Sequence, residues 1–481
     1  KNYGYAQTLA LKGKAYPTAL RIISEGGLSV LYKHSPQELR QILRNATPVE
    51  RARNFNACAL ILLAINLIAS PQDAREERDI LRINLPADWE PSSEENARFL
   101  FLEALDSLPE SGMVEADLRK LLSFCKENEV KLPRDYFQGI FRGVVGQLGF
   151  YYRRSGTLLE NVHTLQSIYD ICGLIIKDCD GRLWHSSAEA ELNYMQGNID
   201  TADEILLHFL KSPWNTIDRQ QRAIIALFLY PRVALIRKTA YEFKDWKKLY
   251  KKLKAAISDD LTKTSLDMVA IHMSSLLEEP SPKQEHLIDT INELPEYNAL
   301  RTMRQSVRHR LNLSLRKYNL ILHTTETKDP YPSANASQMS RCYDAIARIG
   351  ALQYFGKAQE ASALLKSALH ESLQDYFIMP FIEHYNILKP LLLPLASDPV
   401  YAQFLQQARK MAITPISEKA LEETTLTPRE QLIISRVRDG WTNKEIADEL
   451  TTIKKHLTEL YKKFHVHSRT QLLLEIDKSQ K

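Results

Sequence analysis

Apolar residues recur every three or four positions from the N-terminus to about residue 411. This spacing places them on one face of an α-helix, and the alternation that marks a half-buried strand is hard to find. The densest apolar stretch, residues 57–68, suits a buried helix, because it is shorter than the roughly eighteen residues of a membrane span. The pattern therefore predicts an all-α fold.

Three segments of this region resemble one another: YMQGNIDTADEILLHFL, YFGKAQEASALLKSAL and LKGKAYPTALRII. Each places an alanine five or six residues after a glycine, in the pairs Gly197 and Ala202, Gly356 and Ala361, and Gly13 and Ala19. A glycine can end one helix in the left-handed conformation, and a small alanine lets the next helix pack closely on the first. Such pairs cannot bury their faces alone and stack into a solenoid.

These segments resemble tetratricopeptide-like (TPR-like) repeats, although the tryptophan of that consensus is missing. We expect residues 1–412 to form a TPR-like helical-repeat solenoid that acts in sensing and oligomerisation. The alternative is a set of unrelated antiparallel helices. Residues 413–424 are polar and contain Pro415, which indicates a linker to a last domain, residues 425–481.

Three capping boxes lie in the last domain: Thr427 with Glu430, Thr442 with Glu445, and Ser468 with Gln471. In a capping box the hydroxyl accepts from a free backbone N–H, and the Glu or Gln reaches back to the cap. The boxes predict helices over residues 428 to about 439, ended by Gly440, over 443–450, and from 469 to about 476. A further helix is predicted from about 452 to 464 by the apolar stripe Ile453, Leu457, Leu460, Tyr461 and Phe464.

The opposite face of that further helix is basic, with Lys455, Thr458 and Lys462 facing away from the stripe. Between Thr451 and Thr470 there are five Lys or Arg and one Glu, so this segment carries +4, as does the whole protein. A helix that packs by one face and presents lysines on the other suits the major groove of DNA. On charge alone, a solvated face remains the preferred alternative.

The string LTPREQLIISRVRDGWTNKEIADEL, followed by TIKKHLTELYKKFHVHSRTQLL, changes that preference. It resembles the LuxR-type helix-turn-helix domain, whose pieces LTxRE, G-x-[ST]-N-K-E-I-A, T-[VI]-K-x-H-L and V-x-[ST]-R-T all occur here in order. The resemblance implies a four-helix domain that binds double-stranded DNA in a bacterial transcription regulator, and an activator is the form we expect.

The resemblance also assigns roles to single residues of the domain. It places Lys454, Lys455 and Thr458 in the groove, matches His456 to a histidine of the same helix, and sets Lys444 and Lys462 on the DNA backbone. In this family the fourth helix often mediates self-association on DNA. Here Leu472, Leu473 and Ile476 either supply that face or close the small core.

The sequence departs from the family between the second and third helices of this domain. About five residues lie there in the family, whereas only Thr451 stands between Leu450 and Thr452. A helix-turn-helix needs a turn of about three or four residues. We hypothesise that roughly four turn residues are absent from the sequence, so that the Cα atoms near 450–452 lie further apart than ~3.8 Å.

Four stretches of the helical region are similar to the sensor arm of MalT-like ATP-dependent regulators: ALRIISEGGLSVLYKHSPQELRQIL, GVVGQLGFYYRRSG, AEAELNYMQGNIDTADEILLHFL and ESLQDYFIMPFIEHYNILKPLLLPL. This similarity implies that the solenoid binds a small inducer or a regulatory protein on its concave face. Members of that family place a nucleotide-binding domain before the solenoid. This chain contains no GxxxxGK[ST] phosphate loop, so we expect no cofactor in it; ATP would belong to a preceding domain.

A glycine-rich stretch, Gly139 to Gly149, offers one candidate effector site. Glycines at this spacing allow two helices to pack closely, which is the preferred interpretation. The alternative is a ligand pocket that the next residues, Tyr151, Tyr152, Arg153 and Arg154, would line.

Composition narrows the remaining classes. A chain of 481 residues is too long for one compact core, and its 16 glycines favour helices over a large β or α/β enzyme. The five scattered cysteines indicate buried thiols in a reducing compartment, and we expect a cytoplasmic protein with no membrane contact. His465 and His467 do not share a helical face, so no metal site is expected. No catalytic arrangement is evident, so the rival interpretation is a repeat scaffold that binds protein rather than DNA.

Overall fold

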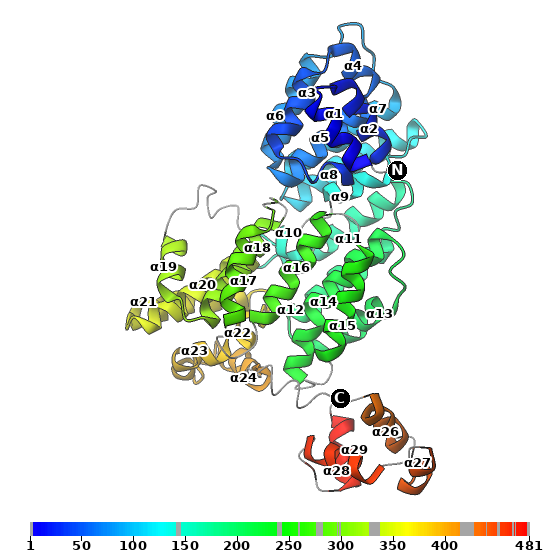
Figure 1. The fold of residues 1–481 in the computed structure, drawn as a ribbon. Coiled ribbons are helices and arrows are strands. Elements are labelled where there is room, and N and C mark those ends of the chain that lie inside the picture. Colours follow the sequence, from blue (N-terminus) through cyan, green and yellow to red (C-terminus); the bar gives the residue numbers. More distant parts are fainter. Residues whose placement is uncertain are drawn as a thin grey trace.

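The computed structural model describes residues 3–140, 146–237, 243–257, 260–275, 282–295, 297, 300–326, 337–413, 428–438, 440–449, 453–463, 466 and 468–478. The elements in these ranges are helices, joined by one isolated parallel bridge between Leu132 and Ile176. The all-α prediction is therefore confirmed (Figure 1). Within the described ranges, no helix combines the length and apolarity that a membrane span requires.

The N-terminal group of helices is built around α5 (Phe55–Ile68), in which nearly every side chain is buried, as the apolar run predicts. Around it lie α1 (Tyr3–Lys12), α2 (Tyr16–Gly26), α3 (Pro36–Asn45), α4 (Pro48–Arg53), α6 (Pro71–Ile83), α7 (Ser93–Ala104), α8 (Ser111–Glu127) and α9 (Phe137–Ile140). Capping boxes at Ser35, Thr47 and Ser92 start α3, α4 and α7.

The middle of the chain continues with longer helices: α10 (Leu148–Tyr151), α11 (Leu158–Ile175), α12 (Arg182–Met195), α13 (Ile199–Lys211), α14 (Ile217–Arg237), α15 (Phe243–Ala256), α16 (Asp260–Ser275), α17 (Pro282–Glu293), α18 (Arg301–Ser314) and α19 (Tyr318–Glu326). The helical region ends with α20 (Gln338–Tyr354), α21 (Ala358–Leu373), α22 (Met379–Glu383), α23 (Tyr385–Leu392) and α24 (Ala402–Met411). From α12 to α20, the even-numbered helices lie side by side: α12 contacts α14, α14 contacts α16, α16 contacts α18, and α18 contacts α20. Stacked helical hairpins make contacts of this kind.

The three repeated segments share one turn between their two helices. In each, a residue with positive φ ends the first helix, and the next N–H donates to a carbonyl five residues back: Asn198 to Asn193 (2.8 Å), Lys357 to Leu352 (2.9 Å) and Ala15 to Ala10 (2.8 Å). The predicted glycine caps are confirmed at Gly197 (φ 79°) and Gly356 (φ 72°). In the first segment the prediction is wrong, because Lys14 (φ 52°) takes the left-handed conformation in place of Gly13.

Counting from the left-handed residue brings the three segments into one register. A fully buried alanine stands five residues later in each: Ala19, Ala202 and Ala361. A fourth hairpin, α18 to α19, has the same turn at Arg316 (φ 56°), with the buried Ile321 five residues on. The sequence pattern missed it because it contains neither the glycine nor the alanine. The relationship of these pairs to TPR repeats stays a prediction.

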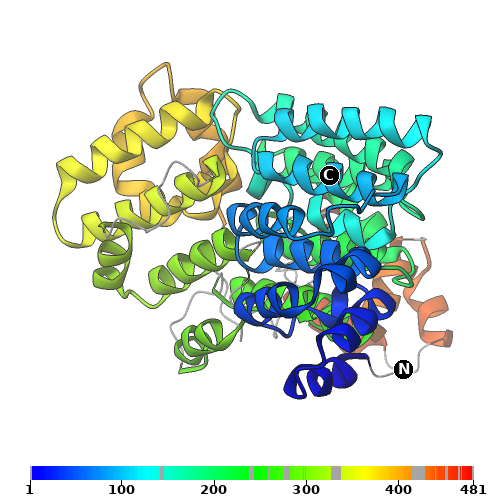
Figure 2. The same cartoon turned by 90° about the horizontal axis from the view of Figure 1, so that it is seen from above.

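The end of the helical region turns back onto its middle. The N–H of Ile378 donates to the carbonyl of Met195 (3.0 Å), and the N–H of Gln338 donates to that of Tyr152 (2.8 Å). Figure 2 shows the yellow and gold helices, α20 to α24, beside the cyan and green ones. One continuous core connects Ala10 with Ile413. The five cysteines are free thiols, and four of them are buried within the helical region.

Candidate nucleic-acid interface

The last domain contains α26 (Pro428–Arg438), α27 (Asn443–Glu449), α28 (Ile453–Lys463) and α29 (Arg469–Lys478), within a residue or two of the predicted bounds. It has its own small core of six buried residues: Ile433, Val437, Ile446, Leu457, Leu460 and Leu472. This core holds the four helices against one another independently of the core of the helical region.

Local chemistry fixes where these helices begin and end. The Thr442 hydroxyl accepts from the N–H of Glu445 (3.3 Å), while the Glu445 carboxylate accepts from the N–H of Thr442 (2.6 Å). These hydrogen bonds lower the pKa of Glu445. Ser468 accepts from the N–H of Gln471 (3.2 Å), whereas the cap predicted at Thr427 lies outside the described residues. Gly440 (φ 83°) ends α26, as predicted.

Helix α28 packs on this core by one face and leaves the other in solvent. Leu457 and Leu460 are buried, whereas Lys455 and Thr458 are exposed. The predicted separation of a buried apolar face from an exposed polar face is therefore present at the positions of α28 that the structure describes. An exposed lysine and an exposed hydroxyl on a helix that packs on a core can donate hydrogen bonds to base edges in a major groove or to phosphate oxygens.

The other predicted DNA contacts surround this face. Lys444 is exposed near the start of α27, and His456 is half-buried on α28. Lys454 and Lys462 belong to α28 by their backbone, but their side chains lie outside the described part. The contacts of these residues with DNA stay predictions.

Arg469 has a role that the sequence pattern did not reveal. Its guanidinium donates to the Asn443 side chain (2.7 Å) and to the carbonyls of Val437 (3.4 Å) and Trp441. It thereby ties the start of α29 to the turn between α26 and α27. Arg469, the arginine of the V-x-[ST]-R-T piece, thus holds the start of α27 in place.

The short connection between α27 and α28 is where the sequence departs from the LuxR-type pattern. Helix α27 ends at Glu449 and α28 begins at Ile453, and both contact α26. Residues 450–452, where we hypothesise missing turn residues, lie outside the described ranges. Of the residues considered for self-association, Leu472 is buried in the core, Leu473 is half-buried against it, and the side chain of Ile476 is not described.

Three of the four residues of the candidate effector site line one surface hollow, and the fourth, Tyr152, does not. Tyr151 and Tyr152 are buried, and their hydroxyls donate to the carbonyl of Ile140 (2.7 Å) and to the carboxylate of Asp375. Arg153 is half-buried, and burial lowers its pKa to about 10. Arg154 is exposed, and it lines a surface hollow with Arg153 and Tyr151. Ligand binding there stays a prediction, and Tyr152 lies outside the hollow.

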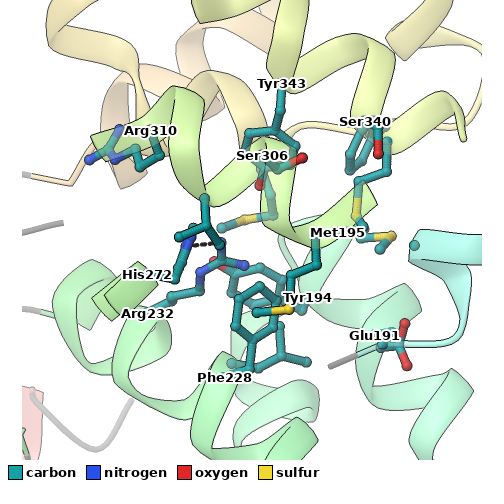
Figure 3. Close-up of a pocket in the computed structure, with 18 of the residues that line it drawn as sticks. Glu191, Tyr194, Met195, Phe228, Arg232, His272, Ser306, Arg310, Ser340 and Tyr343 are labelled. Atoms are coloured by element: carbon teal, nitrogen blue, oxygen red, sulfur yellow. Dashed lines mark hydrogen bonds between the residues drawn. The ribbon is translucent and has the colours of Figure 1, made fainter. Parts of the chain in front are cut away.

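A different cavity, which the sequence pattern did not predict, lies between the stacked helices (Figure 3). Arg232 and Glu383 form a buried ion pair beside it, with Arg232 Nε 3.5 Å from Glu383 Oε1. The hydroxyls of Tyr194 (2.6 Å) and Tyr343 (3.0 Å) donate to the same carboxylate. Charged residues inside apolar runs, such as Arg232 in LFLYPRVALI, were the available sequence signal.

Comparison with known proteins agrees with the geometry of the last domain. Residues 424–475 match the model of bacterial regulatory proteins of the LuxR family, so they form a LuxR-type helix-turn-helix domain. The chain is also 34% identical over 128 residues to the transcriptional regulatory protein ComA of Bacillus subtilis (strain 168), covering 25% of this chain and 54% of ComA. The chain thus spans about half the length of that relative. No solved structure matches the chain.

Proposed function

We propose that this chain is a bacterial transcription regulator, in the form of an activator, that binds promoter DNA through α28. The proposal rests on the two faces of α28 within a LuxR-type domain. Leu457 and Leu460 on one face are buried, and Lys455 and Thr458 on the other are exposed. In the proposed complex α28 enters the major groove, and Lys444 contacts a phosphate at the start of α27.

Control by the helical region is the second part of the proposal. One small domain makes too few contacts for tight binding, so activity should depend on bringing two or more domains to spaced half-sites. The stacked hairpins would gate that assembly when an inducer or a regulatory protein binds them, as in MalT-like regulators. The chain itself performs no catalysis in this proposal, and it acts in the cytoplasm.

The experiment compares the double variant Lys454→Ala, Lys455→Ala with the native chain and with Lys366→Ala, an exposed lysine of α21. DNA sites are first selected from a random pool, and affinity is then measured by gel shift across a salt series. We expect the double variant to bind at least about tenfold more weakly, with a flatter salt dependence because fewer counterions are released. Lys366→Ala should bind as the native chain does.

The same measurement decides between DNA binding and the rival function, a repeat scaffold whose last domain binds protein. Unchanged DNA affinity in the double variant would refute the role of α28. An affinity that hardly falls with salt would favour the scaffold, because phosphate contacts make DNA binding steeply salt-dependent.

A further inference from the structure

The cavity between α12, α14, α16, α18 and α20 joins an apolar wall to a charged end. Met195, Met303, Met339 and Met379 line it together with Phe228. Methionine side chains are flexible and polarisable, so such a wall adapts to ligands of different outline. In Figure 3, Arg310, His272 and Arg232 lie at one side of the cavity and Glu191 lies at the other.

The charge of Arg232 is already balanced within the protein. Its side chain is 4% exposed and that of Glu383 is fully buried, and the two form the ion pair described above. The Arg232 guanidinium also lies over the ring of Phe228, 4.1 Å from the centroid, and it donates to His272. Glu383 in turn accepts from two tyrosine hydroxyls, one on each carboxylate oxygen, so its charge is shared among Arg232 and both tyrosines.

Arg310 has no such balance. It lines the cavity from α18, and within the described ranges it takes part in no hydrogen bond or ion pair. Burial lowers its pKa, and the carboxylate that acts on it is that of Glu383, which already pairs with Arg232. The charged end therefore holds two guanidinium groups and one committed carboxylate.

The remaining titratable groups at the cavity do not supply the missing negative charge. Burial and the two arginines hold the pKa values of His272 and His384 well below the usual range, so both are neutral near pH 7. Burial raises the pKa of Glu191 to about 8, so this carboxyl is mostly protonated there. Arg310 is half-buried, and its Nε is buried without a hydrogen-bond partner. A partly buried charge without a partner is costly, and a bound anion would reduce that cost.

We propose that this cavity binds a small organic anion, with its anionic group on Arg310 beside Arg232 and its apolar body among the methionines and Phe228. The site goes beyond the DNA-binding function and specifies the effector that the proposed regulation requires. An occupant would contact residues of α14, α18 and α20 at once and would hold the stacked helices in one arrangement.

The test uses the full chain and measures binding by calorimetry and thermal shift. The probes are hexanoate, benzoate and 3-phenylpropionate, their uncharged amides, and inorganic phosphate. Arg310→Met removes the unpaired charge, and Arg308→Met is the control on the same helix, where Arg308 donates to the surface residue Asn292 (2.9 Å). We expect the carboxylates to bind, the amides to bind at least tenfold more weakly, and Arg310→Met to lose the carboxylates while Arg308→Met keeps them.

Three outcomes would overturn the proposal: no carboxylate binds at millimolar concentration, the amides bind equally well, or Arg310→Met binds as the native chain does. Phosphate binding without carboxylate binding would also exclude the apolar body of the ligand. A second measurement needs no ligand. Because Arg310→Met removes an unbalanced charge, the free variant should be at least as stable as the native chain, and a lower melting temperature would contradict the assignment. DNA affinity of the free variant should be unchanged, which separates this proposal from the role of α28.

Discussion

The substitution Glu383→Gln tests how strongly the buried ion pair holds the stacked helices together. It removes the negative charge and keeps the shape of the side chain, so Arg232 is left as a buried guanidinium with no counter-charge. Both side chains are less than 5% exposed, at 4% and 0%. Breaking such a pair from one side costs about 3–5 kcal/mol, because the remaining charge stays desolvated.

The matched control is Glu103→Gln, which breaks the pair between Arg82 and Glu103 on the surface. These side chains are 53% and 36% exposed, and pairs of this kind contribute about 0–1 kcal/mol. The assay is urea unfolding followed by tryptophan fluorescence, since Trp184 and Trp246 are buried in the same core. Equal costs for the two variants would refute the reasoning. The double variant Arg232→Met, Glu383→Gln should recover most of the loss, because neither member of the pair is then charged.

Three further predictions concern other parts of the chain. Burial raises the pKa of Glu191 above its unfolded value of 4.5 to about 8. Its contribution to stability is therefore complete below about pH 4.5 and is lost as the pH rises through 8. In urea titrations the native chain should lose up to about 4 kcal/mol of unfolding free energy between pH 5 and 9, and Glu191→Gln should not. Gly356→Ala should lower the free energy of unfolding by about 1–2 kcal/mol through its φ of 72° alone, because nothing lies within 4 Å of the added Cβ. The control Gly112→Ala, in an equally open position within α8, should leave that free energy unchanged or raise it by up to about 1 kcal/mol in the same titration. Arg469→Met should speed hydrogen exchange in residues 428–478 and leave residues 3–413 unchanged; protection that stays the same would contradict its role as a clamp.

The sequence predicted those elements whose causes are local. Thr442 and Ser468 carry their hydrogen-bond partners three residues away, so the starts of α27 and α29 could be predicted within a residue. The same holds for the caps at Gly197 and Gly356. At Gly13 the local rule failed by one position: Lys14 takes the left-handed conformation, and the buried Ala19 stands five residues after it.

The cavity could not be predicted, because its residues come from helices that are distant in the chain. Arg232, His272 and Glu383 lie on three different helices. Arg310 lies on α18 among several other arginines, where a charge usually faces solvent. Their meeting depends on the return of α20 to α24 onto the middle of the region, and no local pattern contains that return. The sequence does contain one indication: a charged residue within an apolar run, such as Glu383 in FIMPFIEHYNIL, has no polar face on which to reach solvent and is therefore expected to be buried.

The return of the chain also brings the cavity close to Ile413, at the end of the described helical region. Glu383 ends the short helix α22, and the carbonyl of its neighbour Ile382 accepts the N–H of Ile413 (3.3 Å). The side chain of Asn386 donates to the carbonyl of the same Ile413 (3.3 Å), which is the first residue of the predicted linker. Because packed helices shift as rigid units, a ligand that draws Arg232 away from Glu383 would displace α22 and the root of the linker together. In the proposed regulation, α22 would therefore link the cavity to Ile413, where the predicted linker begins.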